Sequence, residues 1–201
     1  MINTIILDIG NVLARFGWKD YFLKKGYQEE LIKRVSASTV LSEAWKEWDR
    51  GSVTRDEMAD ICCQYDKEIS SEIRQFFHDL YTIVEEFDFA QEFVQKLKES
   101  GYKIYLLSNF NGEHYLYCKE RFKFIQYIDG SVISYEVNYV KPESQIYQIL
   151  LNKYNINPLQ AVFLDDMEEN LEAAKFFGLH TIHVTDHEQA LLQLRKLGLR
   201  I

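Results

Sequence analysis

The sequence predicts an α/β fold, in which a doubly wound and mostly parallel sheet carries an inserted helical segment. Three observations support this prediction. Short apolar runs, among them Thr4–Leu7 and Ala161–Leu164, alternate with amphipathic stretches over residues 1–15 and 87–201. Residues 16–86 look instead like successive helices, with no convincing strand. Repeated strand–helix units favour a parallel sheet with right-handed crossovers.

The first expected strand is the apolar run Thr4–Leu7, which stops at Asp8 and is broken by Gly10. The amphipathic stretch 89–100 predicts a helix that ends at Gly101. The later elements alternate: a strand over 103–107, a helix over 112–122, a strand over 131–134, a helix over 142–155, a strand over 161–165, a helix over 168–177, a strand over 180–184 and a last helix capped by Asp186 and Gln189.

The inserted segment is expected to form a helical cap. Its helices are predicted over residues 27–36, 40–50, 54–65 and 70–81. The stretch Thr54-Arg55-Asp56-Glu57 has the pattern of a capping box, and Gly51 suits a helix end. We therefore expect an α/β core formed by 1–15 plus 87–201 and a cap formed by 16–86. An insertion directly after a ligand-binding strand end would cover the site as a lid.

Composition narrows the possible partners. The 201 residues carry a net charge of −8, which disfavours nucleic acid as a partner. The three cysteines, Cys62, Cys63 and Cys118, suit free thiols in a reducing cytoplasm, and we expect a cytoplasmic protein. No signal peptide or apolar membrane span is recognisable in the sequence. We expect no membrane partner, and a monomer or weak homodimer.

Polar groups follow the apolar runs at four places: Asp8, Ser108-Asn109, Lys141-Pro142 and Asp165-Asp166. Ligands bind at the carboxyl ends of parallel strands, so these groups are expected to meet there. Carboxylates are the hard oxygen ligands that Mg²⁺ prefers. A carboxylate can also attack phosphorus, and a lysine can neutralise the charge of a phosphoryl group. The set therefore indicates phosphoryl transfer, and we expect a small phosphorylated substrate as the partner.

In this order, the four groups closely resemble the motifs of the haloacid dehalogenase superfamily. Asp8-Ile9-Gly10-Asn11-Val12-Leu13 is similar to the first motif and Leu107-Ser108-Asn109 to the second. Lys141-Pro142 resembles the third, and the run from Leu164 to Asn170 the fourth. The resemblance covers essentially the whole chain, including the helical cap. The form of the first motif resembles a branch that contains sugar-phosphate phosphatases, among them glucose-1-phosphate phosphatases, and the phosphatase domain of soluble epoxide hydrolases.

This resemblance implies a role for each residue. Asp8 would be the nucleophile and a Mg²⁺ ligand, with the Gly10 carbonyl as a second ligand. Asp166 would bind the metal directly, and Asp165 directly or through water. Ser108 and the Asn109 backbone would hold phosphate, and Lys141 would pair with both Asp8 and phosphate. Asn170 would brace the metal loop.

One position departs from the family pattern. Most phosphatases of the superfamily carry a general acid/base Asp two residues after the nucleophile, and this chain has Gly10 there. General acid–base catalysis contributes roughly 10²–10⁴-fold. The missing group implies slow activity, a restriction to substrates with good leaving groups such as glycosyl 1-phosphates, or assistance by water or by a residue of the cap. Asp20, Glu47 and Asp49 are the cap carboxylates considered for that replacement.

Alternatives remain open at this stage: a metal-independent haloacid dehalogenase, a phosphomutase, or a catalytically weak binding or regulatory protein. A phosphoacceptor receiver domain is disfavoured because its acidic pair comes early in the chain. Several residues are interpreted as structural. These are Trp45 and Trp48 as cap packing, Arg15 and Arg50 as surface pairing, Cys62 and Cys63 as buried thiols, and His114, His180, His183 and His187 as structural or exposed.

Overall fold

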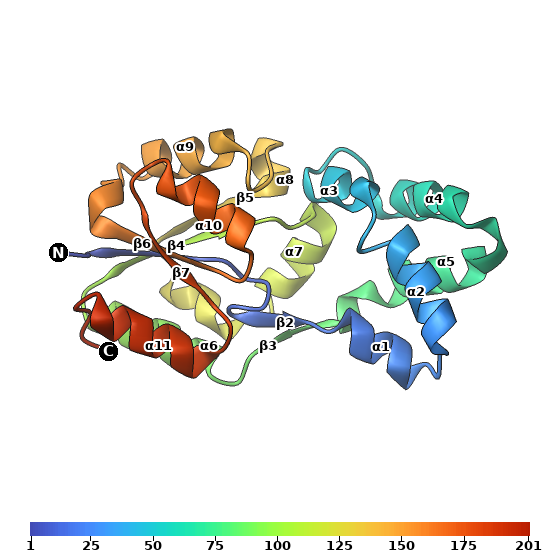
Figure 1. The fold of residues 1–201 in the computed structure, drawn as a ribbon, viewed down its shortest axis with the longest axis horizontal. Coiled ribbons are helices and arrows are strands. Elements are labelled where there is room, and N and C mark those ends of the chain that lie inside the picture. Colours follow the sequence, from blue (N-terminus) through green and yellow to red (C-terminus); the bar gives the residue numbers. More distant parts are fainter.

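A five-stranded parallel sheet lies at the centre of the computed structural model, which describes residues 1–201 (Figure 1). The strand order is β5-β4-β1-β6-β7. This arrangement confirms the predicted α/β class with a parallel sheet. The strands are β1 (Thr4–Leu7), β4 (Lys103–Ser108), β5 (Gly130–Ile133), β6 (Ala161–Asp165) and β7 (His180–His183).

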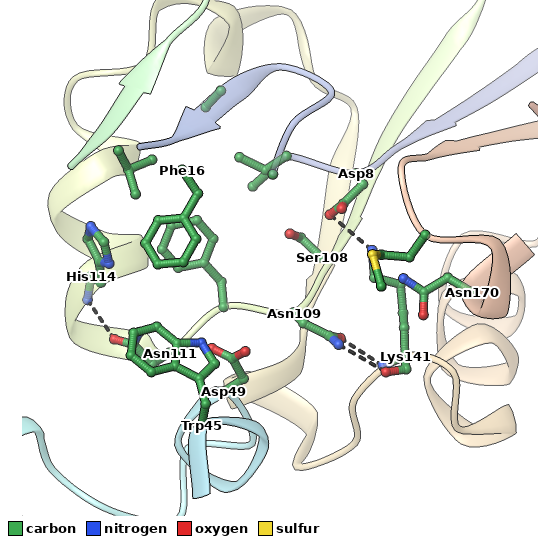
Figure 2. A pocket seen from close by; sticks show the side chains of 16 residues that line it. Asp8, Phe16, Trp45, Asp49, Ser108, Asn109, Asn111, His114, Lys141 and Asn170 are labelled. Atoms are coloured by element: carbon green, nitrogen blue, oxygen red, sulfur yellow. Dashed lines mark hydrogen bonds and ion pairs between the residues drawn. The ribbon is translucent and has the colours of Figure 1, made fainter. Parts of the chain in front are cut away.

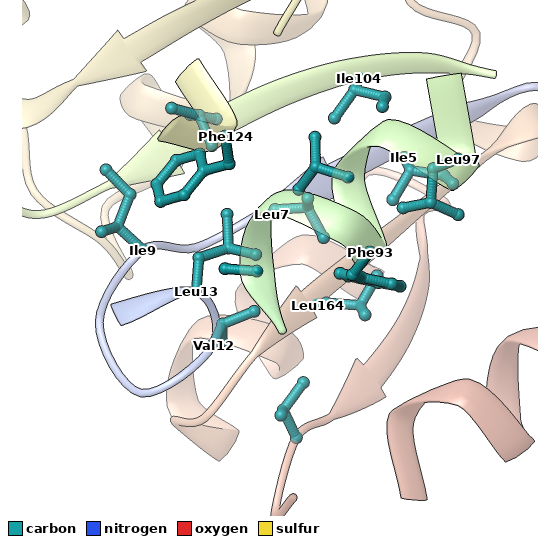
Figure 3. Close-up of a cluster of buried hydrophobic side chains, with 14 of the residues drawn as sticks. Ile5, Leu7, Ile9, Val12, Leu13, Phe93, Leu97, Ile104, Phe124 and Leu164 are labelled. Carbon is teal, nitrogen blue, oxygen red and sulfur yellow. The ribbon is translucent and has the colours of Figure 1, made fainter. Parts of the chain in front are cut away.

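Helices cover both faces of the sheet, because the side chains of each buried strand point alternately to the two faces. Ile5 and Leu7 of β1 join a cluster with α6 (Ala90–Glu99) and α11 (His187–Lys196) on one face (Figure 3). Ile6 packs on the other face, against residues of α9 (Ser144–Lys153) and α10 (Glu168–Lys175). The nucleophile candidate therefore follows a strand held on both sides.

The helices of the cap lie to one side of these layers (Figure 1). They are α1 (Trp18–Lys24), α2 (Glu29–Ser38), α3 (Glu43–Asp49), α4 (Arg55–Tyr65) and α5 (Ser70–Asp79). They bury a hydrophobic cluster of their own, centred on Phe22, Trp48, Phe76 and Phe77. The expected capping box is present, since Thr54 and Glu57 exchange side-chain and backbone hydrogen bonds. The domain boundaries at residues 15/16 and 86/87 stay a prediction.

The expectation that residues 16–86 contain no strand is wrong. β3 (Val84–Glu86) pairs antiparallel with β2 (Ala14–Phe16), with Phe16 opposite Val84. Two glutamates in β3 obscured the apolar pattern that marks a strand, and its hydrogen bonds come from a distant segment. This ribbon carries the chain into and out of the cap.

Two short helices were not predicted individually: α1 and α8 (Ser134–Val137). α8 follows β5 directly and lies, with α7 (Gly112–Lys119), on the side of the sheet that faces the cap (Figure 1). Most predicted helices are present with ends shifted by a few residues, as with the helix expected over 142–155, which begins at Ser144. None of the helices combines the length and the apolar character needed to cross a membrane.

Candidate active site

Three strand ends bring the predicted site residues together. Leu7 of β1 is in register with Leu106 of β4 on one side and Leu164 of β6 on the other. Consequently Asp8, Ser108 and Asp165 lie at neighbouring carboxyl ends of the sheet. Figure 2 shows Asp8 and Ser108 on the same side of a cavity that Asn109, Lys141 and Asn170 also line.

Lys141 reaches this point from the loop before α9. Its Nζ lies 3.0 Å from Asp8 Oδ1 and 2.6 Å from Asp165 Oδ2, and its side chain is 1% exposed. The Asn109 side chain fixes the backbone of Lys141: its Nδ2 donates to the Lys141 carbonyl at 3.0 Å and its Oδ1 accepts from the Lys141 N–H at 2.7 Å. Asn109 thus has a positioning function that the sequence did not predict (Figure 2).

Burial and charge act against each other in this cluster. Burial is the main cause that raises the pKa of Asp8 to about 6, against the opposing field of Lys141. Burial alone would lower the pKa of Lys141, but the charges of Asp165 and Asp8 outweigh it and the pKa is raised. The site therefore holds one buried ammonium among several carboxylates, an arrangement that favours binding of a further cation.

The three predicted acidic ligands converge. Asp8, Asp165 and Asp166 each offer an oxygen within 4.8 Å of the others. The Asp8 Oδ1 atom, although close to Lys141, accepts no well-directed hydrogen bond. Gly10 borders the same cavity, and a Cβ atom there would meet only Asp8 Oδ2, at 4.0 Å. The donor set and the open space beside Gly10 fit a hard divalent cation such as Mg²⁺.

Asp165 is already heavily hydrogen-bonded. Its Oδ1 accepts from the Met167 N–H at 2.8 Å and from Asn170 Nδ2 at 2.9 Å, while Oδ2 accepts from Lys141. Asn170 is held in turn by Tyr147, whose hydroxyl donates to the Asn170 carbonyl at 2.8 Å. Asn170 therefore holds the Asp165 carboxylate, and its role in bracing a metal loop stays a prediction.

Two further residues contact the acidic loop and were missed by sequence reasoning. Asn11 Nδ2 donates to Asp166 Oδ2 at 2.9 Å, which opposes the rise that burial causes in the Asp166 pKa. Asn11 has a φ of 53°, in the left-handed region. An asparagine directly after Gly10 was the available signal, since asparagine tolerates that region. His183 Nε2 lies 2.9 Å from the Asp166 carbonyl.

The cavity extends from Asp8 toward the cap. Its cap side is largely apolar, with Phe16, Trp45, Val84 and Phe110 among its lining residues. Trp45 borders the cavity and also packs against Trp48, which is buried in the cap as predicted. Figure 2 shows Trp45 and Asp49 both reaching toward the cavity from α3.

The other candidate residues lie elsewhere or are already engaged. Arg15 Nη1 lies 2.7 Å from Asp20 Oδ2 on the surface. Arg50 forms a bidentate ion pair with Glu143, in which its two Nη atoms donate to the carboxylate oxygens at 2.7 and 2.8 Å. Both arginines are therefore engaged in ion pairs, as the sequence suggested. Cys62 and Cys63 are buried free thiols.

The histidines form no catalytic group. His180 is exposed, and His187 stacks on Phe89 at a ring-centroid distance of 3.8 Å. His114 is buried beside the cavity, and burial lowers its pKa to about 3. Its Nε2 atom has no hydrogen-bond partner.

The sequence matches the family described as haloacid dehalogenase-like hydrolase over residues 2–178. The chain belongs to this family. This haloacid dehalogenase-like hydrolase is 25% identical over 198 residues to the sesquiterpene phosphatase astK of Aspergillus oryzae. The alignment covers 97% of this chain and 96% of that protein. It is also 25% identical to the D-ribitol-5-phosphate phosphatase of Bacteroides thetaiotaomicron, covering 90% and 91% of the two chains.

Solved structures support the same fold for this haloacid dehalogenase-like hydrolase. A HAD family enzyme from Bacteroides thetaiotaomicron, in complex with magnesium and inorganic phosphate, superposes with a TM-score of 0.72. Sequence identity is 22%, and the match covers 95% of this chain and 99% of that one. The family and the phosphatases among its relatives support assignment of the chain as a hydrolase of the phosphatase type.

Proposed function

We propose that the chain is a Mg²⁺-dependent phosphatase that hydrolyses a small phosphate monoester through an aspartyl-phosphate intermediate. The observation that carries this proposal is the position of Asp8. Its carboxylate ends a buried strand, lies 3.0 Å from the Lys141 ammonium and belongs to a cluster of three carboxylates within 4.8 Å. Such a cluster suits a metal and a nucleophile at one point.

Asp8, Asp166 and the Gly10 carbonyl would hold the metal, and Asp165 would contribute directly or through water. The four hydrogen bonds that Asp165 accepts from Met167, Asn170 and Lys141 favour the water-mediated form. When bound, Mg²⁺ supplies positive charge that offsets the repulsion between an anionic nucleophile and an anionic substrate.

The chain's own residues then provide the remaining functions. The carboxylate of Asp8 attacks phosphorus, and the bond between phosphorus and the leaving oxygen breaks. Lys141 holds Asp8 in place and offsets charge on the transferring oxygens, and the Ser108 hydroxyl and Asn109 N–H bind those oxygens. Water then attacks the aspartyl-phosphate, which releases inorganic phosphate and regenerates Asp8.

A sugar phosphate, as expected from the sequence, is our first choice of substrate. The relative that acts on D-ribitol 5-phosphate supports it. The apolar cap side of the cavity, lined by Phe16, Trp45 and Val84, and the relative named a sesquiterpene phosphatase favour a second candidate, an apolar organic monophosphate. A substrate panel must therefore contain both classes.

The test is phosphate release from a panel of sugar phosphates, polyol phosphates and apolar alkyl or prenyl monophosphates, with Mg²⁺ and with EDTA. We expect activity that requires Mg²⁺ and is lost in Asp8→Asn. The exposed Asp88 provides a matched control, since Asp88→Asn makes the same chemical change away from the cavity. Halide release from 2-haloacids in EDTA, without phosphatase activity, would favour the dehalogenase alternative instead.

A further inference from the structure

Cleavage of a phosphate monoester leaves negative charge on the departing oxygen, and an alcohol forms only when that oxygen receives a proton. The site described above has no evident donor. Gly10 carries no side chain, and the Lys141 ammonium is held between Asp8 and Asp165. His114, with its lowered pKa, is neutral and holds no acidic proton at neutral pH. A donor supplied by the protein itself must therefore be another group on the cavity wall.

Asp49 is the remaining carboxyl group among the residues that line this cavity beyond the acidic loop and Asp8. It is the last residue of α3, on the cap side, where the organic part of a substrate would lie (Figure 2). The two other cap carboxylates considered from the sequence point elsewhere. Asp20 pairs with Arg15 on the surface, and Glu47 is exposed.

Contacts with the core hold Asp49 at this place. The Ser134 hydroxyl donates to the Asp49 carbonyl at 2.5 Å. The next residue, Arg50, binds Glu143 through both arms of its guanidinium group, and Asn138 Nδ2 donates to the Arg50 carbonyl at 3.0 Å. Hydrogen bonds and an ion pair thus connect the end of α3 to the segments before and after Lys141.

The surroundings of Asp49 favour the protonated acid. Burial is the main cause that raises its pKa to about 7, and the charge of Asp8 adds to it. The Asn111 backbone N–H and the more distant Lys141 charge oppose the rise. Arg50 is committed to Glu143, and His114 on α7 is neutral, so neither supplies a counter-charge. A carboxyl that titrates near neutral pH can serve as acid and base in turn.

We propose that Asp49 is the proton donor to the leaving group, in place of the carboxyl that the chain lacks at position 10. This inference rests on the proposed phosphatase function. As the Asp8 oxygen bonds to phosphorus and the ester P–O bond breaks, the Asp49 carboxyl gives its proton to the departing oxygen and becomes a carboxylate. In the second step that carboxylate takes a proton from the attacking water, and the products are inorganic phosphate and the original acid.

The test compares leaving groups of different basicity. An aryl ester such as p-nitrophenyl phosphate leaves as a weak base, whereas an alkyl phosphate leaves as a strong base that requires protonation. The parameter is kcat/KM, which covers the steps up to formation of the aspartyl-phosphate. For Asp49→Asn we expect kcat/KM to fall roughly 10²–10⁴-fold with the alkyl ester and less than about tenfold with the aryl ester.

Asp20→Asn and Glu47→Gln are the matched controls, and both should leave the two substrates unchanged. With the alkyl ester, the unmodified enzyme should lose kcat/KM as pH rises past the Asp49 pKa, and Asp49→Asn should lack this limb. Retained aryl phosphatase activity shows that the variant is folded. An equal loss on both esters, or no loss on either, would overturn the proposal. Absence of Mg²⁺-dependent aryl phosphatase activity in the unmodified protein would instead contradict the phosphatase function itself.

Discussion

Replacing Asp49 by Asn should make the protein more stable at neutral and alkaline pH. Asn has nearly the same shape and keeps a side-chain oxygen near the Asn111 backbone N–H. It removes a carboxylate that burial and the neighbouring Asp8 charge disfavour. Groups that serve chemistry often lower stability in this way, because their surroundings are set for the reaction and not for the folded state.

The size and direction of the effect follow from linkage. Folding raises the Asp49 pKa from 3.8 to about 7, a difference worth at most ~4 kcal/mol at 1.36 kcal/mol per unit. Because Asp49 is half-buried and water reaches it, we expect about 1–3 kcal/mol. Between these two pKa values the native state binds more protons than the unfolded state, so unfolding free energy falls as pH rises. The gain in unfolding free energy from Asp49→Asn is therefore absent below about pH 4 and complete above about pH 7.

Thermal unfolding in EDTA, followed at pH 5 and pH 8, measures this difference. For a chain of this size, 1–3 kcal/mol corresponds to a rise in melting temperature of roughly 2–12 °C at pH 8, with a smaller rise at pH 5. Glu47→Gln, a comparable change at an exposed position of the same helix, should leave the melting temperature unchanged. Equal or lower stability of Asp49→Asn at pH 8 would refute the reasoning, since it would show that the native carboxylate is not disfavoured.

Three further outcomes are expected. Asp8→Asn should abolish phosphate release, by 10³-fold or more, with an unchanged circular dichroism spectrum; turnover within tenfold of the unmodified enzyme would exclude an aspartyl-phosphate. Asp166→Ala should raise the Mg²⁺ concentration needed for half-maximal activity at least tenfold, which a Mg²⁺ titration measures; an unchanged midpoint would exclude Asp166 as a ligand. Lys141→Met should lower the unfolding free energy by about 3–5 kcal/mol in chemical denaturation, because Asp8 and Asp165 lose their buried counter-charge; an unchanged value would show that the ion pairs contribute little.

Most of the sheet could be predicted from the sequence because its strands are buried on both faces. Continuous apolar runs such as Thr4–Leu7 and Ala161–Leu164 have few alternative explanations when helical stretches separate them. β3 could not be predicted in this way. Its three residues include Glu85 and Glu86, and its stability comes from pairing with Ala14–Phe16, about 70 positions earlier.

The strand-end residues of the site could also be located from the sequence, since parallel strands present their carboxyl ends at one edge. The sequence did not show how their side chains are held. Asn109 reaches across to the backbone of Lys141, and Asn11 reaches Asp166, through contacts that no local pattern encodes. Among Asp20, Glu47 and Asp49, only the packing of the cap against the core distinguishes the one that borders the cavity.

The paired strands β2 and β3 have a consequence for how this protein can be altered. Phe16 and Val84 lie opposite each other, so the segment between them begins and ends at adjacent points of the backbone. A two-residue hairpin turn is long enough to join antiparallel strands at such a point. Residues 17–83 are therefore a natural unit for exchange with another insert or for excision. Such a graft would replace Trp45 and Asp49 in the wall of the cavity, and would leave Asp8, Lys141 and the acidic loop in place.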